Sequence, residues 1–361
     1  MNPAGTAAVA DLPGPSPRNS AVHLAPDAVR HVRGGHPWVF DGSIRRTTGG
    51  PAGDGNGAPG DVAVLFDTDR RFVAVGLWDP GSPIRVKVLH REARTGLDDA
   101  FWTGALRAAL DRRASLAEDA AAGVTTGYRL VHGENDGLPG LVLDRYGDTA
   151  VLKLYSAAWF PHLAAVVAAV AALAAPDRLV LRLGRAVAAG PTFGLRDGSV
   201  LLGEAPDGPV RYRENGLELE ADVVHGQKTG TFLDQRDNRA LVRDLSRGGR
   251  VLDVCCCTGG FTVHAAAGGA RHVVSVDQSR PALDATARNL ARNASSPTVA
   301  ACGHDAIADD AFRAMAGLAR RGERFDLVVV DPPSFASRQR EVRGALEERR
   351  ERVAAIEARE L

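Results

Sequence analysis

Four acidic residues in the last third of the chain stand at or near the ends of apolar segments. Asp253 lies in VLDVCC, Asp277 ends HVVSVD, Asp305 lies in GHDA, and Asp331 ends FDLVVVD. In open α/β sheets the ligand binds in the crevice at the carboxyl ends of the strands. If these segments are neighbouring parallel strands, their carboxylates gather in one ligand site.

Asp253 opens a strand-to-helix turn, DVCCCTGGF, that carries the glycine pair Gly259 and Gly260. Glycines let a ligand approach the backbone, and the first N–H groups of a helix are free donors for it. The string differs from the G-x-G-x-x-G fingerprint of dinucleotide-binding folds. The turn alone is a weak indication, because a tight connection without a ligand has the same pattern.

Asp277 is placed to accept hydrogen bonds from both ribose hydroxyls of an adenosine cofactor. Capping of the next helix is the alternative, a role for which Ser279 competes. Asp305, followed by Ala306, predicts a contact to the adenine amino group, although a helix cap explains it equally well on spacing alone. We favour the cofactor interpretation for Asp277 because it occurs together with the turn at Asp253.

The segment Asp331–Phe335, DPPSF, is the most specific of the four features. Pro332 and Pro333 stiffen the turn and fix the direction of its carbonyl groups. Asp331 is predicted to point into the cleft, where it holds the substrate during catalysis, and Phe335 is available for stacking. The two prolines and Phe335 are therefore predicted to bind the substrate.

These residues need a parallel sheet to bring them together, and the pattern from about residue 226 predicts one. The apolar segments VLDVCC, HVVSVD, TVAACGHD and FDLVVVDPP alternate with the helical segments FTVHAAAGG, PALDATARNLARN and AFRAMAGLARR. Alternating helices and nearly continuous apolar strands are typical of a sheet covered on both faces. The predicted fold class is α/β, with a Rossmann-like domain over residues 226–361.

Two further domains are predicted upstream. Residues 21–95 contain short apolar strands divided by Asp, Gly and Pro turns, which indicate a small β-barrel. Residues 97–225 predict an α+β domain, with a helix over about 98–122 capped by Asp98. A hairpin that turns at Asn215-Gly216 belongs to the same domain.

The expected cellular location of the protein follows from its N-terminus and from its longest apolar segment. Residues 1–20 are small, proline-bearing and aperiodic, so we expect them to be disordered and see no signal peptide. Leu163–Ala175 is shorter than the roughly 20 residues that cross a bilayer and predicts a buried helix. We therefore expect a cytoplasmic protein without a membrane partner.

The composition excludes several classes of protein. Among 361 residues, 44 Lys and Arg balance 44 Asp and Glu, and 45% hydrophobic with 24% charged residues is ordinary for a globular protein. Zero net charge argues against a protein that coats nucleic acid, without excluding local basic surfaces. The four cysteines lack the C-x-x-C spacing of zinc sites, so we predict no metal, and a reducing compartment.

In this order, the four acidic segments resemble those of the class I S-adenosylmethionine-dependent methyltransferases. Other strings resemble, more closely, the bacterial cytosine-C5 methyltransferases of large-subunit ribosomal RNA with an N-terminal PUA domain. These strings are GHPWVF at 35–40, GENDGLPGLVLDRYGD at 133–148, ENGLELEADV at 214–223 and HGQKTGTFLDQRDNR at 225–239. The resemblance covers about residues 25–340, and GQKTG-FLDQR is its most specific part.

The resemblance implies an RNA-binding PUA barrel over 21–95, a central domain beside the RNA cleft over 97–225, and a cofactor domain over 226–361. Arg33, His36 and Trp38 are candidates for the RNA surface, although burial explains Trp38 better. The residues implied in binding S-adenosylmethionine are Gln227, Thr229, Phe232, Asp234, Arg236, Asp253, Cys257, Gly259, Gly260, Asp277, Ser279, Asp305 and Ala306. Ribosomal RNA is the implied partner, and a homodimer is compatible with the sequence.

Such enzymes need a cysteine, because cytosine C5 is a poor nucleophile until a thiolate adds to C6. The family carries this cysteine at the end of the strand after its DPPSF-type segment. Here 361 − 331 = 30 residues follow Asp331, and they contain neither a cysteine nor an apolar strand. We interpret the chain as a shortened family member with impaired or lost catalysis, in which the strand before Asp331 presents an unpaired apolar edge.

Two other functions remain open. The Asp-Pro-Pro-x-Phe turn resembles the acceptor loop of methyltransferases that act on exocyclic amino groups and need no cysteine. The missing cysteine favours this alternative, and the GQKTG-FLDQR string opposes it. The other alternative is a non-catalytic RNA-binding relative with a residual cofactor domain.

Overall fold

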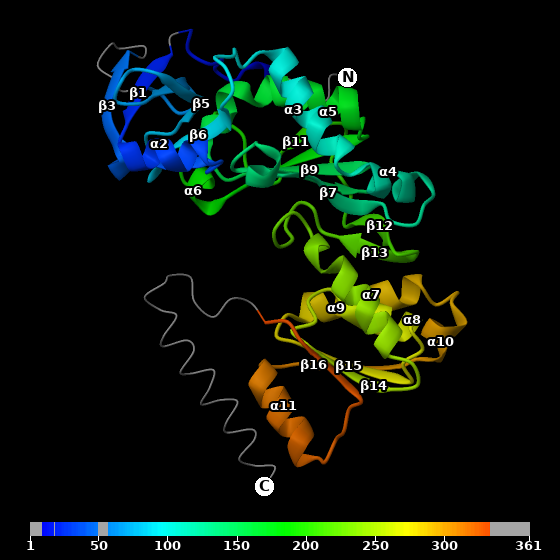
Figure 1. Cartoon of the computed structure of the whole chain (residues 1–361). Helices are drawn as coiled ribbons and strands as arrows, with labels where there is room; N and C mark the ends of the chain where they lie inside the picture. The colour runs from blue at the N-terminus through cyan, green and yellow to red at the C-terminus, as the bar shows by residue number, and fades with distance from the viewer. Residues whose placement is uncertain (1–8, 18, 50–56, 333–361) are drawn as a thin grey trace. The chain divides into compact units, whose positions relative to one another are not determined.

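The computed structural model describes residues 9–17, 19–49 and 57–332, which divide into two compact units (Figure 1). Unit 1 comprises Met1–Arg213 and Ala221–Thr231, and unit 2 comprises Glu214–Glu220 and Phe232–Leu361. The predicted boundary at residue 226 therefore falls inside a segment, 221–231, that packs with unit 1.

Unit 1 begins with a six-stranded sheet in the order β2-β6-β5-β4-β1-β3. Along β1, Val22 and Leu24 are buried and pack with Val29 and Val32 of a helix, so the strand has one core face and one outer face. The elements are β1 (Ser20–Leu24), α2 (Pro26–Arg33), β2 (Trp38–Phe40), η1 (Asp41–Ser43), β3 (Ile44–Gly49), β4 (Val62–Phe66), β5 (Phe72–Trp78) and β6 (Ile84–His90). The predicted β-rich segment is confirmed, and α2 adds a helix that the strand pattern did not indicate.

A five-stranded sheet in the order β11-β10-β9-β8-β7 follows in the same unit. Trp102 and Val166, from two helices, pack on one face of it with Leu143 and Leu152. The elements are α3 (Asp99–Asp111), α4 (Ala114–Ala121), β7 (Gly127–His132), η2 (Gly133–Asp136), β8 (Leu141–Tyr146), β9 (Thr149–Leu154), η3 (Ala157–His162), α5 (Leu163–Ala174), β10 (Arg178–Leu183), α6 (Arg185–Ala188) and β11 (Val200–Leu202).

The predicted helix over 98–122 is two helices, α3 and α4. Its predicted cap is confirmed, because Asp98 Oδ1 accepts a hydrogen bond from Phe101 N at 2.9 Å. The helix breaks at Arg112 and Arg113, whose Nη1 atoms donate to the buried Asp136 Oδ1 at 2.7 and 2.9 Å. This tertiary ion-pair cluster ends the first helix where the local sequence pattern does not.

The apolar run near residue 165 forms η3 and α5. The segment Ala157–Ala174 is long and apolar enough to cross a membrane by length and composition, and half of it is buried inside the structure. Its residues Trp159, Leu163 and Val170 belong to the core of unit 1. The prediction of a buried helix is confirmed.

A buried polar joint connects the two sheets of unit 1. Asp79 Oδ2 accepts hydrogen bonds from Lys87 Nζ and from Ser156 Oγ, both at 2.6 Å. Nearby, His162 Nε2 donates to the carbonyl of Gly60 at 2.8 Å. Because these groups are satisfied inside the protein, the joint stabilises the packing of the β-rich sheet on the central one.

The predicted disorder of residues 1–20 is wrong for two of the residues that the structure describes. Val9 is buried in the same core as Trp102, and Ser20 is the first residue of β1. A segment with prolines and no regular pattern can still be ordered when one of its apolar side chains packs in the hydrophobic core.

Unit 2 contains a parallel sheet in the order β16-β15-β14-β17. Its elements are η4 (Leu233–Gln235), α7 (Arg236–Leu245), β14 (Arg250–Val254), α8 (Gly260–Ala267), β15 (His272–Asp277), α9 (Arg280–Arg292), α10 (Pro297–Ala301), β16 (Gly303–Ala308), α11 (Ala311–Arg320) and β17 (Leu327–Val330). Val251 and Phe261 belong to one core cluster of this sheet, and Val254 and Leu318 to another. The predicted parallel α/β sheet is confirmed.

Two local predictions have different outcomes. The hairpin is confirmed as β12 (Val210–Glu214) and β13 (Leu217–Ala221), with Asn215 and Gly216 at φ 51° and 82°. The third predicted strand, TVAACGHD, is wrong in its first half, because residues 297–301 form α10. Pro297 at the first turn favours that helix over the strand that Thr298 and Val299 suggest.

Among the described residues, β17 pairs only with β14 and stands at the margin of the sheet. Its side chains alternate, and Val328 and Val330 are 49% and 51% exposed. The predicted apolar margin is therefore present within the described part of unit 2. The charged helical pattern predicted after Asp331 lies outside the described residues.

Candidate functional site

The turn after β14 has a backbone conformation that allows a ligand to approach it closely. Cys255, Cys257 and Gly259 have φ values of 62°, 50° and 77°, in the left-handed region that non-glycine residues rarely adopt. A Cβ on Gly259 would lie 2.4 Å from Thr286 Cγ2, so only glycine fits there. The turn exposes backbone N–H groups at the start of α8, which is a suitable place for a polar ligand.

Asp277, the last residue of β15, organises that turn. Its Oδ2 accepts a hydrogen bond from Cys257 N at 2.9 Å, and its Oδ1 accepts one from Ser279 N at 2.8 Å. Ser279 Oγ accepts from Ala282 N and caps α9, so Asp277 is not needed as that cap. A carboxylate accepts about four hydrogen bonds, so Asp277 keeps acceptor capacity for a ligand.

Asp253 lies beneath the turn and has an unusual environment. It is 1% exposed, its Oδ2 accepts from Thr262 Oγ1 at 2.7 Å, and its Oδ1 has no hydrogen-bond partner among the described residues. Burial raises the pKa of Asp253 to about 6. A buried carboxylate oxygen without a donor is costly, and positive charge close to the turn would offset part of that cost.

Asp331 follows β17 at the same end of the sheet. Its backbone N–H donates to Val254 O at 3.3 Å, and Gln235 Nε2 donates to its Oδ2 at 3.3 Å. The side chain is exposed, and Pro332 beside it is half-buried. Pro333 and Phe335, the other predicted substrate-binding residues, lie outside the described residues.

The predicted position of Asp305 is wrong. Asp305 and Ala306 lie inside β16, opposite Val274 and Ser275, rather than at the strand end. Asp305 Oδ2 lies 3.0 Å from Nε2 of His272, the first residue of β15, so it faces the amino ends of the strands. The misread third strand explains this error, because β16 runs on to Ala308.

Asp310 stands where Asp305 was predicted. It follows the end of β16, its Oδ1 accepts from Phe312 N and Arg313 N, and Gln278 Nε2 donates to its Oδ2 at 3.1 Å. Gln278 directly follows Asp277 at the end of β15. An aspartate before the amphipathic AFRAMAGLAR segment is a helix-start signal that could have identified Asp310.

The loop that contains Gln227 and Thr229 belongs to unit 1 and is fixed there. Thr229 is buried, and its Oγ1 donates to Asp144 Oδ2 at 2.7 Å and lies 3.0 Å from Tyr146 Oη. Arg182 Nη2 donates to Gly226 O at 2.9 Å. Thr229 thus positions the loop, while Gln227 is exposed on it.

The residues of the FLDQR string, 232–236, lie just before and at the start of helix α7 in unit 2. Phe232 and Asp234 precede α7, and Arg236 is its first residue. Arg236 Nε donates to Asp237 Oδ1 at 3.0 Å. Gln235, which was not among the predicted site residues, donates a hydrogen bond to Asp331. Glutamine in this string could have been recognised as a substrate-side group because it has both a donor and an acceptor.

The four cysteines are protonated thiols at neutral pH. Burial is the main cause that raises the pKa of each of Cys255, Cys256, Cys257 and Cys302. Only a thiolate is an effective nucleophile. None of these four groups has the electropositive environment of a catalytic cysteine, so packing is their simplest role.

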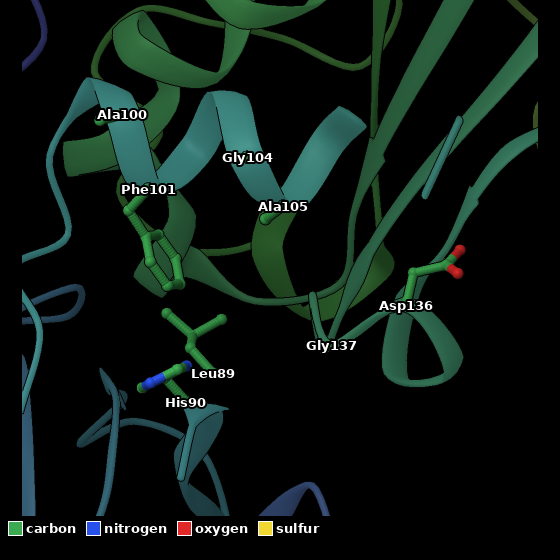
Figure 2. Close-up of a pocket in the computed structure, with 8 residues that line it drawn as sticks. All are labelled: Leu89, His90, Ala100, Phe101, Gly104, Ala105, Asp136 and Gly137. Carbon is green, nitrogen blue, oxygen red and sulfur yellow. The ribbon is translucent and has the colours of Figure 1, made fainter. Parts of the chain in front are cut away.

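A hollow of about 340 Å³ lies in unit 1, between the end of β6 and α3 (Figure 2). Leu89, His90 and Phe101 face one another there, whereas the Asp136 carboxylate points away from them. Since Asp136 is neutralised by Arg112 and Arg113, the hollow offers mainly apolar surface. Within the described ranges, no group of three or more His, Cys, Asp or Glu residues could hold a metal ion.

The parallel sheet, the glycine turn and the acids at the strand ends define the class I S-adenosylmethionine-dependent methyltransferases. A family profile of S-adenosylmethionine-dependent methyltransferases matches residues 178–347, and one of PUA-like domains matches residues 22–91. The cofactor of this chain is S-adenosylmethionine, and the chain is a methyltransferase with a PUA-like domain.

Two relatives show to which family within this class the chain belongs. A ribosomal RNA large subunit methyltransferase from Deinococcus radiodurans is 45% identical over 336 residues, covering 92% of this chain and 80% of the relative. Ribosomal RNA large subunit methyltransferase I from Salmonella arizonae is 36% identical over 310 residues, covering 86% and 73%. The chain belongs to this family of large-subunit ribosomal RNA methyltransferases.

Solved structures agree on the fold. An S-adenosylmethionine-dependent methyltransferase from Streptococcus mutans has a TM-score of 0.72 at 19% identity, covering 91% of this chain and 82% of that one. A methyltransferase solved in complex with S-adenosylhomocysteine also has a TM-score of 0.72, at 21% identity, covering 90% and 78%. At such identities the likeness supports the architecture.

Proposed function

We propose that the carboxyl ends of β14, β15 and β16 hold S-adenosylmethionine. Asp277 accepts the ribose hydroxyls, the turn at Gly259 and Gly260 lies against the cofactor, and Asp253 provides a negative charge for its ammonium group. Asp310 takes the adenine-side role first expected of Asp305. The acceptor capacity that Asp277 keeps at the end of β15 supports this arrangement most directly. The buried charge of Asp253 beneath the turn adds a negative potential that favours a cation there.

Cofactor binding is expected to weaken as the pH falls below about 6. Asp253 has its pKa raised to about 6, so it becomes neutral below that value and loses its attraction for a cation. The affinity for S-adenosylmethionine should rise about tenfold per pH unit below this pKa and level off above it. Calorimetric titration of the cofactor across this range measures the profile.

An Asp253→Asn variant should lose this pH dependence together with much of the affinity. Asp305→Asn is the matched control, because Asp305 is exposed inside β16 and should leave the profile unchanged. A pH profile that persists in Asp253→Asn would assign the titration to another group and contradict the proposed role.

For the reaction, we propose methylation of C5 of a cytosine in large-subunit ribosomal RNA. The 45% identity to a ribosomal RNA large subunit methyltransferase over most of both chains supports the RNA substrate, and the resemblance of the GQKTG-FLDQR string to the cytosine-C5 methyltransferases supports the reaction at C5. The cofactor supplies an electrophilic methyl group on its sulfonium. Asp331, held beside Gln235 at the end of β17, is placed to hold the polar edge of the base while Pro332 keeps the turn rigid.

A second reaction, methylation of an exocyclic amino group, has one observation in its favour. C5 chemistry needs a thiolate, and burial keeps all four thiols of the printed sequence protonated. An amino group needs only acceptors, and Asp331 is one such acceptor with a neighbouring carbonyl of a rigid turn.

Product analysis separates the two reactions. The protein is mixed with large-subunit ribosomal RNA and S-adenosylmethionine that carries a labelled methyl group, and the RNA is then digested to nucleosides. Label in 5-methylcytidine would support the C5 reaction and contradict the impaired catalysis expected from the sequence, and label in an amino-methylated nucleoside would establish the second reaction. RNA without label would agree with lost catalysis. Since ribosomal RNA is the substrate, we also propose a cytoplasmic location.

A further inference from the structure

The outer face of the six-stranded sheet in unit 1 carries a row of side chains from three neighbouring strands. His23 on β1 lies opposite Arg46 on β3 and opposite Phe66 on β4. Cross-strand partners share one face of a sheet, and the buried neighbours Val22 and Leu24 occupy the other face. Figure 1 shows β1 and β3 side by side at the margin of this sheet.

The row contains a stacked aromatic pair with cations around it. The rings of His23 and Phe66 are 5.6 Å apart at an interplanar angle of 27°. The Arg94 guanidinium lies over the Phe66 ring, 5.1 Å from its centroid, and Arg46 Nη2 donates to His23 Nε2 at 3.4 Å. Arg70, in the turn between β4 and β5, adds a further positive charge close to His23.

The three arginines are exposed. Asp67 and Asp69, the acids nearest in sequence to Arg70, are engaged by Arg33 and Arg71, and Asp41, the acid nearest to Arg46, is engaged by Arg85. Glu92, two positions before Arg94, is one further acid, so the arginines outnumber the unpaired acids nearest to them in sequence. Within the described ranges, no ion pair forms with Arg46, Arg70 or Arg94. Burial, followed by the charges of Arg46 and Arg70, lowers the pKa of His23, so its ring stays neutral and free of charge repulsion.

This combination has no evident role in folding. Clustered like charges on a surface are mildly destabilising, and exposed arginines around half-buried rings contribute little to a core. The same combination suits single-stranded RNA, because guanidinium groups contact phosphates and aromatic faces stack on bases. Its position on an outer sheet face leaves the rings accessible from solvent.

We propose that Arg46, Arg70 and Arg94, with His23 and Phe66 between them, form an RNA-contact surface for a single-stranded segment of the ribosomal RNA substrate. We call these five residues the arginine patch. This inference rests on the proposed ribosomal RNA substrate and adds a second place where that RNA is held. The arginines bind phosphates, and the His23–Phe66 stack supports one base.

The test is a triple variant, Arg46→Glu, Arg70→Glu and Arg94→Glu, titrated with fluorescently labelled large-subunit ribosomal RNA at several salt concentrations. Affinity should fall at least about tenfold, and the slope of log affinity against log salt should become less steep by about 2, since each single-strand phosphate contact contributes about 0.7. Phe66→Leu should weaken binding severalfold without changing the slope, because it removes stacking and no charge.

The matched control is Arg107→Glu, Arg196→Glu and Arg247→Glu, which changes the net charge equally at three exposed arginines outside the patch. Equal affinities and slopes in the two triple variants would overturn the arginine patch while leaving the proposed substrate intact. Absence of ribosomal RNA binding by the unchanged protein would overturn both. Thermal unfolding of each variant verifies that the surface changes leave the fold intact.

Discussion

An Asp277→Asn variant is expected to bind S-adenosylmethionine about a hundredfold more weakly than the unchanged protein. Asp277 holds the backbone N–H groups of Cys257 and Ser279, and it is the proposed acceptor for the ribose hydroxyls. A hydrogen bond to a charged group contributes about 1.5–3 kcal/mol, and two of them correspond to about a hundredfold or more in affinity.

The asparagine also places an NH₂ group where only acceptors fit, so the turn over Cys257 should loosen. Calorimetric titration with the cofactor measures the loss. Asp284→Asn is the matched control, because Asp284 is exposed on α9, close in sequence and of the same charge. Wild-type affinity in Asp277→Asn would move the ribose site away from the end of β15.

The second large effect is expected in unit 1. Replacing Lys87 by Met should lower the free energy of unfolding by about 3–5 kcal/mol, because it leaves the Asp79 carboxylate buried without its cation. Both side chains are less than a tenth exposed, at 6% and 7%. The Ser156 hydroxyl that remains on Asp79 is too weak a partner to replace an ammonium group. Urea unfolding followed by Trp fluorescence measures the change.

Arg85→Met provides the comparison on the same strand. Arg85 pairs with Asp41, whose side chain is 66% exposed, so its loss should cost at most about 1 kcal/mol. The double variant Asp79→Leu with Lys87→Met should recover part of the stability, since it removes the unpaired charge as well. If Lys87→Met were as mild as Arg85→Met, the joint between the two sheets would not depend on this ion pair.

Sequence patterns predicted correctly those parts of the fold that depend on residues close together in the sequence. The strands ending at Asp277 and near Asp331, the cap at Asp98 and the turn at Asn215-Gly216 all follow from signals within a few residues. The alternation of strands and helices then places Asp253, Asp277 and Asp331 at one end of a sheet. These three acids raise the pKa of Cys255 together, after burial, which agrees with their proximity.

The predictions failed where residues distant in the sequence determine the local structure. The break between α3 and α4 depends on Asp136, which lies more than twenty residues beyond Arg112 and Arg113. Asp305 was misplaced because β-branched residues resembled a strand where Ser296 and Pro297 start a helix. The contacts that hold Thr229 could not be predicted locally either, because its partners Asp144 and Tyr146 come from a strand over eighty positions earlier.

The joint at Asp79, Lys87 and Ser156 also limits how such chains can recombine. A chimaera that exchanges only the PUA-like segment, with a crossover near residue 96, would separate Asp79 and Lys87 from the serine selected alongside them. A crossover beyond Arg213 keeps all three together with the rest of unit 1's first segment. Inheritance of the β-rich and central parts as a single block is therefore the expected pattern among relatives.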